Sequence, residues 1–298
     1  MSGERQWTGR TDGAGWMHRA LIGLMKVLPM PVMYFLMALV VPFYLVFNHK
    51  GYLAIYHYLR RRQGWSVWRS FWGCCANHFL FGASLMDRFA AFAGKKFEMD
   101  IPEYHLFTDL AEGGEGFLLL ASHIGNPELC GYMLCSDRKR MNAVSFAGEK
   151  SSVQDSRSRM LGGNNIRLIQ ADEGMEWLFT LNAALSDGEI VGIHADRVFG
   201  SPKTLTVNLL GAPAQIPLGP FSLAASRELP VLAAFSLKTG LKRYHACIFR
   251  LDTPQMESLS RPDRMQALAE RYALSVEAVL KQWPLQWYNF YEFWKDQI

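Results

Sequence analysis

Charged residues are scarce in this chain of 298 residues: they make up 19% of it, below the ~25% that is typical of soluble domains. The net charge of +4 is small. No helix-turn-helix, zinc-finger or RNP-like pattern occurs, so no nucleic-acid partner is expected. The chain is instead 50% hydrophobic and 13% aromatic, with nine tryptophans. This composition indicates that part of the surface faces something other than water.

Cysteine is also rare, and the five cysteines do not form a pattern. Their number is odd and no Cys-x-x-Cys spacing occurs, which argues against a disulfide framework and against a cysteine zinc site. We therefore expect buried thiols in a reducing compartment.

The N-terminus lacks the pattern of a cleavable signal peptide, because a polar, Gly-rich stretch precedes the first apolar run. No charged residue occurs from Val27 to Asn48, and a helix needs about 20 apolar residues to cross the hydrocarbon core of a bilayer. Pro42 lies inside this run and should kink or end a helix. We predict a transmembrane or deeply embedded anchor, with a pair of buried core helices as the alternative. Basic residues flank the run on both sides and leave its orientation open.

The segment from Gly51 to Trp72 alternates aromatic and basic residues, a pattern that suits the headgroup layer of a membrane. An ordinary half-buried helix is the alternative. We predict that residues 16–93 are helical and face a membrane. The expected organisation is a membrane-associated helical region over residues 1–95 and an α/β domain over residues 96–298.

From about Glu98 the pattern changes to alternating strands and helices, which predicts an α/β fold with a central, mostly buried β-sheet flanked by helices. The C-terminal part, Arg264–Trp294, is predicted to form two helices separated at Pro284. The expected strands are Phe117–Ala121, Met141–Phe146, Glu189–His194, Leu205–Leu210, Val231–Leu237 and Tyr244–Leu251. The expected helices between them are Pro127–Cys135, Ser151–Met160, Glu173–Ser186 and Phe221–Arg227.

The most informative segment follows the first of these strands and has the sequence S-H-I-G-N-P-E. Asn126 is a good N-cap and Pro127 suits the first helical position, so a helix should begin there. Glu128 then lies in the first helical turn, where the helix dipole favours its charge. His123 lies just outside that turn. We predict that the Glu128 carboxylate holds one imidazole nitrogen of His123. A histidine packed at a strand end, with a capping glutamate, is the alternative.

A His–carboxylate pair suits the transfer of an acyl group from a thioester to a hydroxyl or an amine. A neutral nucleophile must lose its proton as the new bond forms, and a histidine can accept that proton near neutral pH. The carboxylate fixes the tautomer of the ring and stabilises the imidazolium. Ser122 is adjacent to His123, but no Gly-x-Ser-x-Gly motif is present, so an acyl-serine intermediate is not expected.

A second block of sequence follows the same order of features. H-A-D-R-V-F-G follows a predicted strand and precedes TLTVNLLGAPAQIPLG and FSLAASRELPVLAAF. Together with H-x-x-x-x-E, the apolar N-terminus and the aromatic C-terminus, this block resembles the lysophospholipid acyltransferase superfamily over about residues 20–295. The closest resemblance is to the bacterial late acyltransferases of lipid A biosynthesis, the lauroyl and myristoyl transferases. Asp196, Arg197, Gly211, Pro213, Gly219 and Pro230 fall at the corresponding places.

The resemblance implies that His123 is the general base and that Glu128 supports it. It implies an acyl-carrier-protein or CoA thioester as the acyl donor, no further cofactor, and a lipid or glycolipid acceptor. It also implies a place at the bacterial inner membrane with the catalytic domain facing the cytoplasm. Two departures, H-A-D-R for the usual D-x-D/Q turn and Pro127 where an aromatic residue is common, leave the acceptor open between lipid A, amino-acid lipids, glycolipids and pigment lipids.

Five further residues are candidates for substrate binding: Asn126, Asp196, Arg197, Arg157 and Arg159. Arg197 can hold a phosphate of the carrier or of the acceptor headgroup through a bidentate contact, or it can form a strand-end salt bridge with Asp196. Arg157 and Arg159 can contact a headgroup or simply lie on a solvated helix face.

Two rival functions remain to be tested. His123, Glu128, His194 and Asp196 are ligand-type residues, so a metal-dependent hydrolase is one alternative. No His-x-x-x-His or His-Glu-x-x-His motif occurs, and we expect no metal site. A membrane scaffold with an inactive acyltransferase fold is the other alternative.

Overall fold

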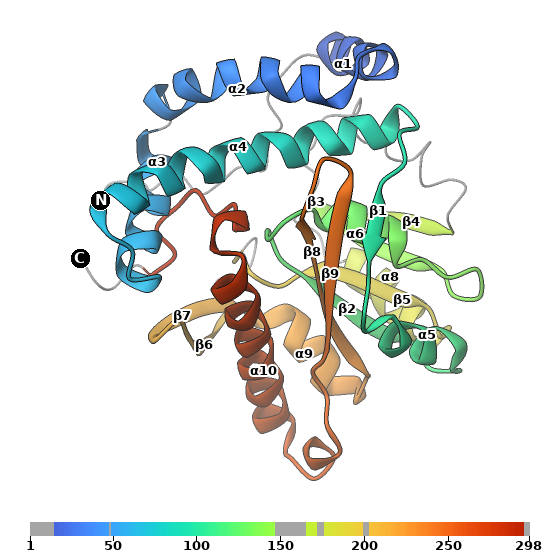
Figure 1. Ribbon diagram of the computed structural model, residues 1–298. Coiled ribbons are helices and arrows are strands. Elements are labelled where there is room, and N and C mark those ends of the chain that lie inside the picture. The colour runs from blue at the N-terminus through green and yellow to red at the C-terminus, as the bar shows by residue number, and fades with distance from the viewer. Residues whose placement is uncertain (1–14, 48, 147–164, 172–175, 199–202, 295–298) are drawn as a thin grey trace.

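A computed structural model describes residues 15–47, 49–146, 165–171, 176–198 and 203–294. Its centre is a seven-stranded mixed sheet in the order β1-β9-β8-β2-β5-β3-β4, and β6 and β7 form a separate two-stranded sheet. The fold is therefore α/β with a central sheet flanked by helices, as predicted (Figure 1). The strands are β1 Glu98–Asp100, β2 Phe117–Ala121, β3 Met141–Phe146, β4 Ile166–Ala171, β5 Ile190–His194, β6 Thr204–Leu209, β7 Ala212–Pro217, β8 Val231–Lys238 and β9 Arg243–Arg250.

The strands β8, β2, β5, β3 and β4 run parallel, whereas β9 runs antiparallel to β8 and β1 follows the direction of β9. In the register of β2 and β5, Ala121 lies beside His194. The loops that follow β2 and β5 therefore leave the sheet next to each other. Ligands of open α/β sheets bind outside the carboxyl ends of parallel strands, so this edge is the place to look for a site.

Both faces of the sheet are covered, which explains the near-continuous apolar sequence of its central strands. Along β2, Leu118 and Leu120 pack toward α8, α9 and α10, and Phe117 and Leu119 pack toward α5 and α6. The covering helices are α5 Tyr104–Glu112, α6 Pro127–Met133, α8 Glu176–Ser186, α9 Leu218–Arg227 and α10 Arg261–Gln282, with short 3-10 turns at η2 Pro254–Met256 and η3 Pro284–Gln286.

The N-terminal part is helical, as predicted. It consists of α1 Gly15–Val27, α2 Met30–Phe47, α3 His49–His57, a π-helical turn η1 Tyr58–Arg62, and α4 Val67–Phe92. Figure 1 shows α4 lying across one end of the sheet, with α2 on its outer side. Pro42 does not end α2, which continues through this residue to Phe47, and the kink expected as the other outcome stays a prediction. The division expected at residue 95 falls between α4 and β1.

The predicted strands from Phe117 onward all form, but β1, β4 and β7 were missed. The predicted second C-terminal helix was wrong. After η3 the described chain to Trp294 has no helix, and Trp287 instead pairs with Ile124 of the loop after β2. Asn77 of α4 holds this segment by donating from Nδ2 to the carbonyl of Trp287 at 2.9 Å. Tertiary hydrogen bonds and buried aromatic rings thus override the local helical pattern. The predicted helix Ser151–Met160 lies outside the described residues.

Candidate active site

The loop after β2 carries His123 and is held against β8 by a close backbone contact. Gly125 has φ +63°, and a Cβ at this position would lie 1.8 Å from the carbonyl oxygen of Ser236. Only glycine fits such a conformation and such an approach. The backbone N–H of Asn126 donates to that same carbonyl at 2.8 Å. The loop is therefore fixed on the sheet, and His123 is fixed with it.

The His123 ring is paired with Asp196, which lies in the loop after β5. The Nδ1 atom of His123 lies 2.9 Å from Oδ1 of Asp196, and the backbone N–H of His123 donates to Oδ2 at 2.8 Å. A carboxylate at Nδ1 favours the tautomer that carries its proton there, which leaves Nε2 as a proton acceptor. The side chain of Asp196 is 5% exposed and that of His123 is 22% exposed. The His123 side chain is thus partly exposed, whereas the Asp196 carboxylate is buried.

The charges of this pair are set by burial and by each other. Desolvation lowers the pKa of His123 below its ordinary value of 6.5, although Asp196 opposes this shift. Desolvation alone would raise the pKa of Asp196, but the charge of His123 and its hydrogen bond, with help from Arg197, hold that pKa well below the usual range. At neutral pH the pair therefore consists of a neutral imidazole and an ionised carboxylate, which is the form a general base requires.

Glu128 lies in the first turn of α6, as predicted, but the carboxylate at Nδ1 of His123 is Asp196. Asp196 therefore has the orienting position that the sequence analysis gave to Glu128. The Glu128 carboxylate accepts a hydrogen bond from the Tyr132 hydroxyl at 2.6 Å and lies 3.5 Å from Nη1 of Arg88 in α4. The sequence pattern did not reveal this, because the order of strands that brings Asp196 to His123 is a tertiary property.

Asn126 caps α6, as predicted, with its Oδ1 accepting from the backbone N–H of Leu129 at 3.2 Å. Its Nδ2 donates to the carbonyl of Ser84 at 3.2 Å and lies 3.5 Å from the Tyr244 hydroxyl. With 3% exposure, Asn126 is buried and both ends of its amide contact the protein. This geometry favours a positioning role over the substrate contact that we predicted.

Arg197 and His194 flank the pair. The guanidinium of Arg197 donates from Nη2 to the carbonyl of Tyr288 at 2.8 Å and lies 5.8 Å from the ring of Tyr291. Arg197 thus holds the C-terminal segment beside the site, and the phosphate contact stays a prediction. The ring of His194 lies 4.8 Å from the ring of His123, centroid to centroid.

The C-terminal segment and α10 complete the surroundings of the loop, and the sequence analysis gave them no role there. The backbone N–H of Tyr288 donates to the carbonyl of His123 at 2.9 Å. The hydroxyl of Tyr272, in α10, donates to the carbonyl of Ala121 at 2.9 Å. The many aromatic residues of the C-terminus indicated that this segment is buried, but the sequence did not show that it packs against the loop of His123.

Within the described ranges, no three His, Cys, Asp or Glu side chains are grouped as metal ligands. Arg157 and Arg159 lie outside these ranges, so their predicted headgroup contacts stay predictions. His123, Asp196, Arg197 and His194 are brought together, and Glu128 and Asn126 lie on the adjoining helix start.

A neutral histidine oriented by a buried carboxylate, at the carboxyl edge of a parallel sheet, is an arrangement typical of enzymes that activate a nucleophile. The chain matches the model of the bacterial lipid A biosynthesis acyltransferase family over residues 93–296 and belongs to that family. No curated protein sequence matches it. The protein is therefore a lipid acyltransferase, in agreement with the resemblance found in its sequence.

Proposed function

We propose that the protein moves a fatty acyl group from an acyl-carrier-protein or CoA thioester to a hydroxyl or amine of a lipid or glycolipid acceptor, with His123 as the general base. The observation that carries this proposal is the contact between Nδ1 of His123 and the ionised Asp196, which favours the imidazole tautomer with its proton on Nδ1 and its lone pair on Nε2.

The reaction balances with the groups of this site. The acceptor oxygen or nitrogen attacks the thioester carbonyl carbon while its proton passes to Nε2 of His123. The tetrahedral intermediate then collapses, the carbon–sulfur bond breaks, and the leaving thiolate takes the proton from the imidazolium. Asp196 stabilises that imidazolium through its charge. Glu128, held by Tyr132 and Arg88, adds a second negative charge at the start of α6 and supports the same proton transfer.

We further propose that α2 and the first turns of α4 enter the inner membrane, with the catalytic domain on its cytoplasmic side. Met30–Phe47 is long and apolar enough to cross a bilayer, with a mean hydropathy of 2.1 and 11% of its residues buried. Phe35, Phe43 and Phe47 are at least 64% exposed, and in α4 Trp68 and Trp72 are at least 66% exposed. Large apolar patches of this kind mark protein or membrane contacts.

The function is tested by incubating the purified protein, in detergent or vesicles, with acyl-carrier-protein or acyl-CoA thioesters and a lipid extract. We expect lipid mass spectrometry to show a species heavier by one acyl group, formed by the wild-type protein and not by His123→Ala. A product that forms equally well with the His123→Ala protein would overturn the proposal. The rival hydrolase activity would appear as free fatty acid without a heavier lipid.

A further inference from the structure

The helix α4 contacts the start of α6 directly, although the sequence assigns this helix to the membrane-associated region. The Ser84 hydroxyl donates to the carbonyl of Gly125 at 3.2 Å, and the Ser84 carbonyl accepts from Asn126. One turn later, Arg88 reaches Glu128. The inner side of α4 therefore forms part of the wall that holds the catalytic loop.

Between these two contacts, Asp87 is the centre of a buried polar cluster. Its carboxylate is fully buried and lies 2.6 Å from Nζ of Lys238, whose side chain is 9% exposed. The hydroxyls of Tyr244 and Tyr34 each donate a hydrogen bond to the same carboxylate. The ammonium of Lys238 also donates to the Tyr34 hydroxyl at 2.8 Å and to the Leu241 carbonyl at 3.1 Å. We call Tyr34, Asp87, Lys238 and Tyr244 the ionic joint.

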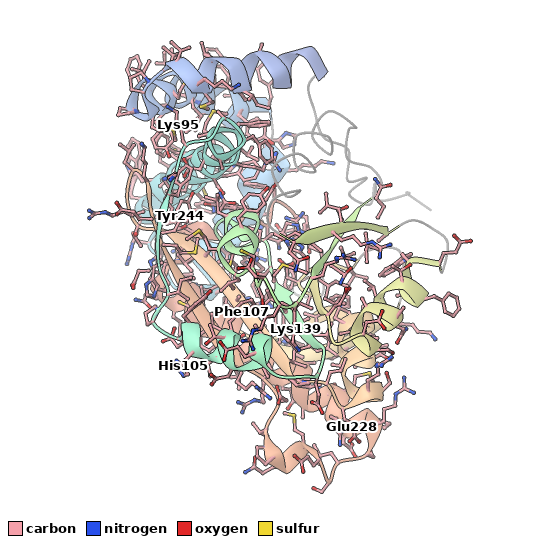
Figure 2. All side chains as sticks on the ribbon, turned by 90° about the vertical axis from the view of Figure 1, so that its right-hand side faces the viewer. Lys95, His105, Phe107, Lys139, Glu228 and Tyr244 are labelled. Atoms are coloured by element: carbon pink, nitrogen blue, oxygen red, sulfur yellow. The ribbon has the colours of Figure 1, made fainter. Side chains whose placement is uncertain are left out.

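Through the ionic joint, the Asp87 carboxylate of α4 is bound by side chains from three other elements: α2, β8 and β9. Figure 2 shows Tyr244 near the end of the sheet that the N-terminal helices cover, away from His105 and Phe107 of α5. A buried ion pair adds little net stability, because the desolvation of both charges offsets their attraction. Its fully paired hydrogen bonds do fix a single geometry. The cluster is thus better explained by a need for position than by a need for stability.

Two short routes lead from the ionic joint to the catalytic loop. In the first, the Tyr244 hydroxyl lies 3.5 Å from Nδ2 of Asn126, the cap of α6. In the second, the side-chain amide of Gln286 accepts from the backbone N–H of Lys238 at 2.8 Å and donates to the backbone carbonyl of Lys238 at 2.9 Å. The backbone carbonyl of Gln286 in turn accepts from the N–H of Gly125 at 2.7 Å. Both routes end within three residues of His123.

Tyr34 makes the apolar helix α2 part of this arrangement. Its ring packs edge-on against Phe79 of α4, with 6.4 Å between ring centroids. Three residues on, Met37 packs onto α4 so closely that a Cβ at Gly82 would lie 2.5 Å from the methionine sulfur. A helix that serves only as an anchor needs no hydrogen bond to a buried carboxylate that is also paired with Lys238 of the α/β domain. The Tyr34 hydroxyl therefore connects the packing of α2 on α4 to the residues that hold the loop after β2.

We propose that Asp87 is a positioning residue of the acyl-transfer site and that Tyr34 makes the docking of α2 on α4 a condition for the active geometry of the catalytic loop. This inference rests on the proposed function of His123. Displacement of a reacting group by an ångström costs ~100-fold in rate. Loss of the joint should therefore lower kcat by about 10- to 100-fold without removing the protein from the membrane.

The experiment compares Tyr34→Phe with Tyr44→Phe in the full-length protein reconstituted in vesicles. Both tyrosines lie on α2, but Tyr44 contacts His78 and lies outside the joint. We expect Tyr34→Phe to lower kcat, to leave KM for the thioester within about twofold, and to shift the acid limb of the kcat/KM profile, because His123 loses its fixed contact with Asp196. Tyr44→Phe should match the wild type in every readout, and both proteins should remain with the vesicles.

A second variant separates position from stability. Lys238→Met alone leaves a buried carboxylate without its cation and is expected to unfold at a lower temperature. The double variant Asp87→Leu/Lys238→Met removes both charges and should recover that melting temperature, while kcat stays low. Recovery of kcat together with the melting temperature would show that the joint is only structural and would overturn the inference. Wild-type kcat in Tyr34→Phe would also overturn it, whereas activity in His123→Ala would instead overturn the proposed function.

Discussion

Two buried carboxylates of this protein, Asp196 and Asp87, are each paired with a basic side chain, yet their surroundings differ in one respect. Asp196 is sealed, but its partner His123 is 22% exposed. Asp87 and its partner Lys238 are both sealed, at 0% and 9%. A pair with one accessible member can exchange protons with a substrate, whereas a pair with none can only hold elements together. The His123–Asp196 pair therefore differs from the Asp87–Lys238 pair in the accessibility of its basic side chain rather than in the type of its acidic residue.

The comparison between the two pairs fails if His123, the exposed member of the His123–Asp196 pair, is not the general base. We expect His123→Ala to lower kcat/KM by about 100- to 10,000-fold, because a general base contributes that much to proton transfer. Steady-state kinetics with a thioester donor measure the loss, and circular dichroism checks the fold. His105→Ala, at an exposed position of α5, is the matched control and should be fully active. Full activity in a folded His123→Ala protein would show that the His123–Asp196 pair has no more part in proton transfer than the Asp87–Lys238 pair.

The two carboxylates near His123 can be ranked by amide substitutions. We expect Asp196→Asn to lower kcat by about 100-fold or more, because the amide lacks the negative charge and its NH2 group can donate to Nδ1, which favours the wrong tautomer of the ring. Glu128→Gln should cost less. Since the charge of Asp196 raises the pKa of His123, its removal should move the acid limb of the kcat/KM profile further below pH 6.5. Each double variant with His123→Ala should be little worse than His123→Ala alone. A larger loss in Glu128→Gln than in Asp196→Asn would make Glu128 the partner of the base.

The outer side of α2 provides a contrast to both pairs, because it offers apolar surface instead of charge. We expect Phe43→Asp to weaken sedimentation with anionic vesicles by about 10-fold or more, since an inserted phenylalanine contributes ~1.5–3 kcal/mol. Phe43 is 67% exposed on α2, and Phe179 is 74% exposed on α8. Phe179→Asp is therefore the control and should bind as the wild type does. Equal binding of the three proteins would show that α2 does not enter the bilayer.

The smallest effect is expected for substitutions of Arg197, which lies beside the His123–Asp196 pair and does not accept the proton itself. Because the charge of Arg197 lowers the pKa of His123, Arg197→Met should move the acid limb toward higher pH, opposite to Asp196→Asn. If the guanidinium also grips a phosphate, KM for donor or acceptor should rise several-fold while kcat changes less, and Arg197→Lys should rescue poorly. A change in kcat alone would limit Arg197 to holding Tyr288.

Much of the frame of the site was predictable from short-range patterns. The strand before His123, the Asn126 cap and the place of Glu128 in the first helical turn follow from local rules on apolar runs and helix starts. The C-terminal helix expected after Pro284 was wrong for a related reason. A local pattern carries no information on the hydrogen bonds by which Asn77 and the loop after β2 hold that segment in an extended form.

The sequence by itself determined the α/β class, the apolar α2, the catalytic histidine as a candidate and the acyltransferase family, because these depend on periodicity, composition and motif order along the chain. Only the tertiary structure decided which carboxylate meets that histidine. The sequence favoured Glu128 because it is close to His123 along the chain, whereas the parallel pairing of β2 with β5 places Asp196 at Nδ1. The same holds for Asp87, whose role emerged only when the packing of α2, α4, β8 and β9 enclosed it, since burial and partnership are properties of the folded chain.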